Sequence, residues 1–197
     1  MADTFHHEPP YTIGVICGSI AASSINRRLA NALIKLAPAD LQCSFIEIDT
    51  LDLYDHDRDD AYPPEALELK RAISAADGIL IVTPEYNRSI PGALKNAIDW
   101  ASRPWGTNSL ARKPVGIAGA SPSGIGTAVG QQHLKAIMSF CNAPLMNEIE
   151  AYITFKEEDF DDDDNCTNES TKGFLQNYMN AYDDFVRRVL TVVPQLR

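Results

Sequence analysis

Cysteine is scarce in this 197-residue chain, and it never occurs in a short paired motif. The four cysteines are far apart, so the C-x-x-C elements of zinc knuckles and redox pairs are missing. A disulfide scaffold is an equally poor fit for so few dispersed thiols. The opening residues, MADTFHHEPP, contain no basic and apolar signal region. We therefore expect a chain that stays in a reducing cytoplasm.

Long apolar runs and a surplus of basic residues are missing as well. No apolar stretch approaches the roughly 20 residues that a membrane helix needs. The net charge is −10, and the run 157–164 (EEDFDDDD) holds seven acids and no base, which leaves only −3 on the rest of the chain. That patch would repel a phosphate backbone, and no basic stripe offers another docking face. Neither a membrane nor nucleic acid is expected as a partner.

Several catalytic motifs are also absent. The chain has no Walker loop, and its nearest approach to a Rossmann G-x-G-x-x-G, at 124–130, has one spacer residue too many. A cysteine phosphatase would need an arginine six residues after Cys17, where Ser23 stands, so we interpret Cys17 as a buried strand residue. The histidines stand in no triad context, and His133 is interpreted as a helix-surface or interface residue. We expect no catalytic side chain and no metal ligand.

What the chain does contain is a regular alternation of apolar runs and helical periodicity. Strands are expected at residues 11–17, 42–48, 78–83, 114–118 and 143–150, and helices at 24–36, 64–76, 91–101, 127–141 and 171–193. The run GILIVT at 78–83 is typical of a strand buried on both faces. The pattern predicts the α/β class, with one domain over 11–193 and a parallel sheet covered on both faces. Residues 1–10, with His6 and His7, are expected to be a flexible N-terminus.

Three loops follow the strands that should border a ligand, because such sheets bind ligands beyond the carboxyl ends of their strands. Residues 18–24 are small or hydroxylated and open a helix, which suits either a phosphate cradle or an ordinary capped turn. Residues 83–92 (TPEYNRSIPG) place an acid, an aromatic, an amide and a base between two prolines. That rigid polar loop suits a flat heterocycle, and the plainer alternative is a turn with a surface tyrosine. The third loop is 121–126.

The segment TPEYNRSIPGALKNAIDW resembles the signature of the flavodoxin-like NAD(P)H-dependent FMN reductases, a family that includes quinone, chromate and azo-dye reductases. The first loop is similar to the family's G-S-x-R-x-x-S-x-N element, and residues 120–126 (ASPSGIG) are similar to its A-S-P-G-x-x-G stretch. The order of elements matches from residue 11 to about 193. The resemblance implies a single flavodoxin-like domain, with a five-stranded parallel sheet in the order 2-1-3-4-5.

The resemblance also implies an FMN site. The phosphate would be held by Ser19, Ser24, Ile25 and Asn26; the isoalloxazine would be bordered, mostly by main chain, by Pro84, Glu85, Tyr86 and Asn87; Ser121, Pro122 and Ser123 would contact its dimethylbenzene or ribityl side. The chain departs from the pattern at Ala21, where the family commonly has an arginine. We expect weaker FMN binding as a result, unless Arg27 or Arg28, one turn into the helix, compensates rather than facing solvent.

The implied activity is a ping-pong oxidoreduction through FMN, in which NAD(P)H supplies the electrons. The acceptor is a small molecule: a quinone, an azo dye or a metal oxyanion. Two alternatives stay open. A flavodoxin-type electron carrier suits the acidity, but the first loop is rich in serine and alanine and has no aromatic residue. A flavin-free scaffold has Ala21 as its only support.

The resemblance further implies a homodimer or a homotetramer. Trp100 and Trp105 are expected at the flavin-side end of the helix 91–101, in a region that packs against a second subunit. The helix 127–141 either adds its apolar residues to that interface or buries them in its own core; these are Leu134, Ile137, Met138 and Phe140. The acidic run lacks the glycine and the closing glutamate of an EF-hand, so residues 156–170 are expected to form a solvated surface loop.

Overall fold

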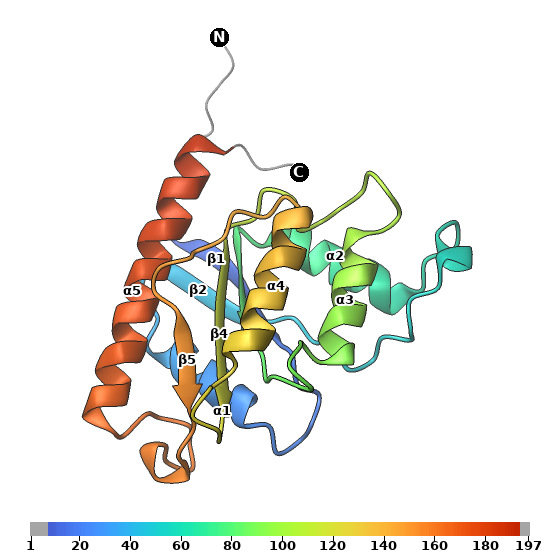
Figure 1. Ribbon diagram of the computed structural model, residues 1–197. Coiled ribbons are helices and arrows are strands. Elements are labelled where there is room, and N and C mark those ends of the chain that lie inside the picture. Colours follow the sequence, from blue (N-terminus) through green and yellow to red (C-terminus); the bar gives the residue numbers. More distant parts are fainter. Residues whose placement is uncertain (1–7, 194–197) are drawn as a thin grey trace.

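The computed structural model describes residues 8–193, and its centre is one parallel five-stranded sheet (Figure 1). The strands are β1 (Tyr11–Cys17), β2 (Leu41–Phe45), β3 (Gly78–Val82), β4 (Val115–Ser121) and β5 (Ala151–Thr154). Their order is β2-β1-β3-β4-β5, and every neighbouring pair is parallel, so the predicted order is confirmed. The order reverses beside β1, which places a ligand-binding crevice at the carboxyl ends of β1 and β3.

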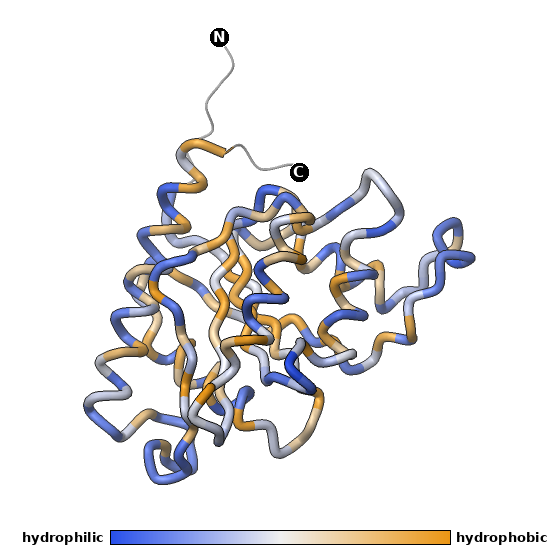
Figure 2. The backbone as a smooth tube through the Cα atoms, viewed as in Figure 1, coloured by the Kyte–Doolittle hydropathy of each residue, from blue (hydrophilic) through white to orange (hydrophobic). Residues whose placement is uncertain are grey.

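Helices cover both faces of the sheet and create two separate cores. The helices are α1 (Ile25–Lys35), α2 (Pro64–Ala75), α3 (Gly92–Ser102), α4 (Ala128–Phe140) and α5 (Glu169–Val192). One core lies between the sheet and α1 with α5, and the other lies between the sheet and α2, α3 and α4. Figure 2 shows the apolar strands in the middle and the polar helix faces outside. Every residue of β3 is buried, as its unbroken apolar run predicts.

The fifth strand lies later in the chain than predicted. Residues 143–150 make only an isolated bridge, from Leu145 to Val115, and the ladder with β4 begins at Ala151. Pro144 has no N–H to donate to a ladder, and the polar residues 147 and 148 separate it from the strand proper. The expectation of a strand at 143–150 was therefore wrong. The other boundaries differ from the prediction by at most a few residues.

The two tryptophans lie at the other end of α3 from the one predicted. The helix starts at Gly92, directly after the loop that follows β3, and it carries Trp100 in its last turn. A helix of this length rises about 16 Å. Trp100 is fully buried between Tyr54 and Tyr62 in edge-to-face contacts, and Trp105 follows the helix end. The helix of a βαβ unit runs antiparallel to its strands, so its C-terminal end lies near the amino ends of the strands. The tryptophans therefore lie far from the loops at the carboxyl ends.

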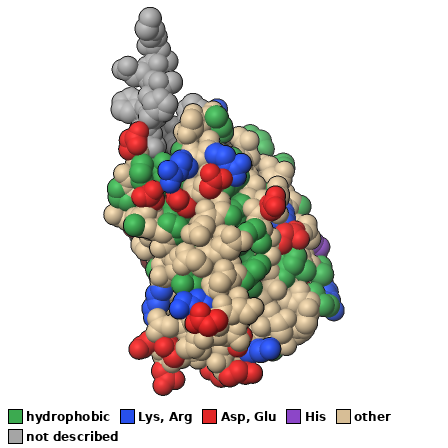
Figure 3. Space-filling view, turned by 90° about the vertical axis from the view of Figure 1, so that its left-hand side faces the viewer, with side chains coloured by type: hydrophobic (Ala, Val, Ile, Leu, Met, Phe, Trp, Pro, Cys, Tyr) green, Lys and Arg blue, Asp and Glu red, His purple; other side chains and the backbone are tan. Residues whose placement is uncertain are grey.

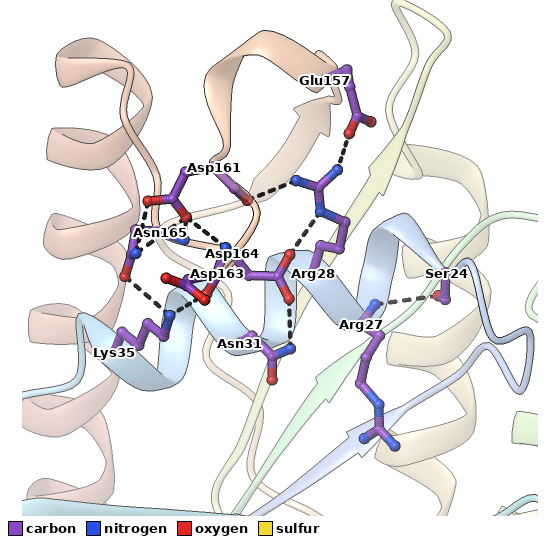
Figure 4. Close-up of polar contacts among 10 residues, drawn as sticks. All are labelled: Ser24, Arg27, Arg28, Asn31, Lys35, Glu157, Asp161, Asp163, Asp164 and Asn165. Carbon is purple, nitrogen blue, oxygen red and sulfur yellow. Dashed lines mark hydrogen bonds and ion pairs between the residues drawn. The ribbon is translucent and has the colours of Figure 1, made fainter.

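The acidic run is on the surface but is not simply solvated. Residues 156–168, here called the acidic strap, connect β5 to α5 and lie across the outer side of α1 (Figure 4). Asp159 is buried, and its carboxylate accepts a hydrogen bond from Thr171 Oγ1. The acids gather beside basic side chains at the lower end of the surface in Figure 3. Three side chains of α1 bind the strap: Arg28 and Asn31 contact the Asp164 carboxylate, and Lys35 contacts Asn165 Oδ1.

The sequence also led to predictions on the N-terminal segment and on membrane-spanning helices. His6, His7 and most of the proposed flexible segment 1–10 lie outside the described residues. Within residues 8–193, no helix has the length and apolar character required to cross a membrane.

Candidate functional site

The three predicted loops meet at the carboxyl edge of the sheet and enclose a cleft of about 230 Å³. Its lining residues are Ser19, Ala21, Ser23, Ser24, Ile25, Asn26, Pro84, Glu85, Tyr86, Ala120, Ser121 and Pro122. Two predicted residues, Asn87 and Ser123, are not among them. Ser23 and Ala120 were missed: both are small, and only their neighbours in the two motifs marked their position.

A larger groove, of about 530 Å³, lies between the end of β2 and α2. Glu47, Glu65 and Glu68 line it, with Arg71 as the one basic side chain of its lining. Three carboxylates oppose a phosphate group, whereas the smaller cleft has a helix N-terminus in its wall. The smaller cleft is therefore the better anion site.

The N-terminus of α1 forms one wall of that cleft. Ser24 is the N-cap, and its Oγ accepts from the Arg27 N–H at 3.2 Å. Ile25 and Asn26 are the first two helical residues, so no preceding carbonyl of the helix accepts from their N–H groups. Such N–H groups, with the positive end of the helix dipole, bind anions. This local geometry follows from a serine cap placed just ahead of an amphipathic segment.

Asn26 has a second role that the sequence did not reveal. It is 1% exposed, its Nδ2 donates to the Ala120 carbonyl at 2.9 Å, and its Oδ1 accepts from the Ala120 N–H at 2.8 Å. The side chain therefore ties α1 to β4 across 94 positions of sequence. The second hydrogen of this amide takes no part in the bridge. The Asn26 side chain, which was expected to bind the phosphate, thus serves first to connect α1 to β4.

No lysine or arginine lines the cleft. Arg27 turns to Glu47, with 2.7 Å to each carboxylate oxygen, and its guanidinium lies over the ring of Phe45. Arg28 binds Asp164 and Glu157 of the acidic strap (Figure 4). Both arginines bind carboxylates outside the cleft. Neither therefore supplies the guanidinium that an arginine in place of Ala21 would bring to the phosphate. The positive potential of the cleft comes from the helix N-terminus.

Cys17, at the base of this wall, is buried as expected. Burial raises the pKa of its thiol above the ordinary value, which keeps the sulfur protonated and weakly nucleophilic at neutral pH. The interpretation of Cys17 as a packing residue is confirmed.

The loop after β3 forms a tight two-residue turn. The Tyr86 N–H donates to the Ser89 carbonyl at 2.9 Å, and the Ser89 N–H donates back at 3.0 Å. Asn87 and Arg88 between them have φ angles of 52° and 64°, which defines a type I′ turn made without glycine. Tyr86 stands half-exposed at the cleft. Asn87 lies at the tip of the turn, which explains its absence from the lining.

The loop after β4 closes the third side. Ser121 Oγ accepts from the Ser123 N–H at 3.2 Å and lies 3.1 Å from Ser123 Oγ. Ser123 therefore shapes the turn, while Ser121 and Pro122 face the cleft. Gly126 completes this turn at a φ of 61°, where a Cβ would also meet the Tyr152 backbone at 2.9 Å.

A parallel sheet of this order, with an anion-binding helix N-terminus and two rigid loops at the switch point, defines the flavodoxin-like class of mononucleotide-binding folds. The family model described as NADPH-dependent FMN reductase matches residues 11–158, and the chain belongs to that family.

Curated relatives agree with this assignment along nearly the whole chain. The chain is 46% identical over 175 residues to a 2-hydroxy-1,4-benzoquinone reductase from Burkholderia sp, which covers 89% of this chain and 96% of that protein. It is 38% identical over 178 residues to a quinone reductase from Pseudomonas putida, covering 90% and 95%. Among solved structures, FerB, a flavoenzyme NAD(P)H:(acceptor) oxidoreductase from Paracoccus denitrificans, superposes with a TM-score of 0.87 at 39% identity, covering 90% and 98%.

Proposed function

We propose that this chain is an NAD(P)H-dependent FMN oxidoreductase that reduces quinones by two electrons. The observation that carries the proposal is the cleft itself, in which a helix N-terminus faces the rigid Tyr86–Ser89 turn across the switch point of the sheet. Membership of the FMN reductase family and the names of the relatives support the same activity. They favour the reductase over an electron carrier or a flavin-free scaffold.

The residues of the cleft fit FMN. The N–H groups of Ile25 and Asn26 and the hydroxyls of Ser19 and Ser24 would hold the phosphate, as donors that need no basic side chain. The isoalloxazine would lie along the segment 84–86, with Ser121 and Pro122 on its other side. FMN, when bound, supplies the hydride chemistry.

The protein itself orients the reactants and needs no nucleophilic side chain. Reductant and acceptor would bind in succession at the cleft beside Tyr86. Each turnover takes a hydride from NAD(P)H and a proton from water and delivers both to the quinone, releasing a hydroquinone and NAD(P)⁺. Azo dyes and metal oxyanions are further acceptor classes within this proposal.

An anaerobic titration tests the activity. One equivalent of NADPH should bleach the flavin absorbance of the FMN-loaded protein, and one equivalent of 1,4-benzoquinone should restore it. Bound flavin that neither NADPH nor NADH can bleach would contradict the proposal and support the electron carrier.

We also propose that the protein is a homodimer. Trp105 and Phe140 are 78% and 74% exposed, and their ring centroids are 6.4 Å apart, so they form one apolar patch from two elements. Leu134 and Met138 are fully buried in the core of their own subunit, and Ile137 packs partly buried against it. Phe140 is the large apolar side chain that α4 exposes to a partner. A homotetramer would require a second contact surface.

A further inference from the structure

Glu85 lines the cleft, and its carboxylate reaches α4. Its Oε2 accepts from the Gly130 N–H at 3.0 Å, and its Oε1 accepts from Arg88 Nη1 at 3.3 Å. Only 9% of the side chain is exposed. The carboxylate therefore lies between the N-terminus of α4 and the guanidinium of Arg88.

Helix α4 depends on this contact because its own cap is missing. The N-cap residue Thr127 makes no side-chain bond to the first turn, since its hydroxyl accepts from Gln131 Nε2 at 2.8 Å. Gly130 is the third helical residue, the position that an N-cap side chain normally serves. Glu85 supplies that cap from a segment 45 positions earlier in the chain.

Two further contacts hold the turn against the same face of α4. A Cβ at Gly130 would lie 3.0 Å from the Ser89 carbonyl oxygen and 3.3 Å from Glu85 Cγ, so the glycine allows a close approach. One helical turn later, His133 Nδ1 lies 3.2 Å from Ser89 Oγ. The positive φ angles of Asn87 and Arg88 are unfavourable for residues with a Cβ and persist only where the surroundings hold them.

We propose that Glu85 is a positioning residue, which fixes the Tyr86–Ser89 turn to the start of α4 and thereby sets where the quinone lies in the cleft. We call the contacts of Glu85 and Ser89 with Gly130 and His133 the turn clamp. Its effect on quinone kinetics rests on the proposed function, but its effect on the turn does not.

Limited trypsin digestion of the flavin-free protein tests the clamp without any activity, because Arg88 is a cleavage site inside the turn. Cleavage by a protease follows the population of the open form. Glu85→Ala should raise the rate of cleavage after Arg88 by about tenfold, the scale of one lost charge-assisted hydrogen bond. Glu85→Gln keeps an oxygen for the Gly130 N–H and should stay within about threefold of wild type. Equal rates in Glu85→Ala and wild type, or equal acceleration in both variants, would overturn the proposal.

A second pair of variants approaches the clamp from the helix side. Gly130→Ala should accelerate the same cleavage, because its Cβ displaces the Ser89 carbonyl. Gly173→Ala on α5, where a Cβ meets nothing within 4 Å, is the matched control and should leave the rate unchanged. Unchanged cleavage in Gly130→Ala would show that the turn does not rest on α4.

Kinetics of the FMN-loaded variants complete the test. Glu85→Ala should lower kcat/KM for 1,4-benzoquinone by about tenfold, mainly through KM. The Kd for FMN should rise by much less, because the main chain of the loop borders the flavin and the phosphate donors of α1 are unchanged. A proportional loss of FMN affinity would make Glu85 a flavin ligand and overturn the positioning role. A wild-type protein without quinone reduction would refute the proposed function, and the digestion would still decide the clamp.

Discussion

Ala21 occupies the position in the cleft where a basic side chain would contact the FMN phosphate. It is exposed in the loop before α1 and lines the cleft, while both nearby arginines bind other carboxylates. Ala21→Arg should add a charge-assisted contact to the FMN phosphate, worth about 1.5–3 kcal/mol. FMN dissociation should slow by roughly ten- to a hundredfold. Fluorescence recovery on dilution measures that rate.

Ala22→Arg is the matched control for this change, because residue 22 is equally exposed but does not line the cleft. It adds the same charge to the same loop. Equal retardation by both variants would show a general charge effect rather than a contact with the phosphate.

Asn26 decides whether α1 stays attached to β4. Asn26→Ala leaves the N–H and the carbonyl of Ala120 without their partner in the interior, at a cost of about 2–4 kcal/mol. Urea unfolding should show this loss. Asn180→Ala, at an exposed site on α5, should change stability by less than about 0.5 kcal/mol. Similar midpoints for the two variants would mean that the bridge adds nothing.

At the scale of elements, the acidic strap and α1 depend on each other through Arg28. Its guanidinium binds Asp164, Glu157 and the Asp161 carbonyl, and its side chain is 22% exposed. Arg28→Ala should cost about 1–2 kcal/mol and increase amide exchange in the strap. Arg27→Ala removes a more exposed pair with Glu47 and should cost below about 1 kcal/mol. The reverse ranking in urea unfolding would contradict this account.

The strap should also respond to acid. Hydrogen bonds from Asn165, together with the N–H of Asp163, hold the pKa of Asp161 below its ordinary value of 3.8. The unfolded state therefore binds the proton first on acidification, so the stabilisation is complete above about pH 4 and is lost as the pH falls through the folded pKa. Amide exchange at 163–165 should rise there. Asp161→Asn cannot titrate, so this variant should flatten the rise in amide exchange. An unchanged profile in the variant would mean that another group causes the rise.

At the scale of the whole molecule, the Trp105–Phe140 patch tests the proposed dimer. Phe140→Lys places a charge at the centre of an apolar contact and should shift the protein toward the 21.7 kDa monomer in light scattering. Val192→Lys alters an equally exposed apolar residue at the end of α5 and should leave the assembly intact. Retention of a dimer in Phe140→Lys would place the interface elsewhere.

Local patterns in the sequence were enough to predict the fold class, the loops of the cleft and the burial of Cys17, and the family resemblance added the strand order. Strand and helix periodicity, a serine cap and the apolar run of β3 are local features, so adjacent residues are enough to recognise them. The fifth strand was misplaced because the apolar segment around Leu145 has strand character but makes only a single bridge, to Val115, and the ladder with β4 starts at Ala151.

The division of side chains between those that serve the cleft and those that serve the fold became visible only in the folded molecule. Asn26 meets β4 across 94 positions, Glu85 meets α4 across 45, and Arg28 meets the acidic strap across 136. Each of these side chains has several possible partners, and packing selects one by distance and burial. No local pattern contains that choice, because hydrogen-bond geometry depends on elements that are brought together only when both cores form.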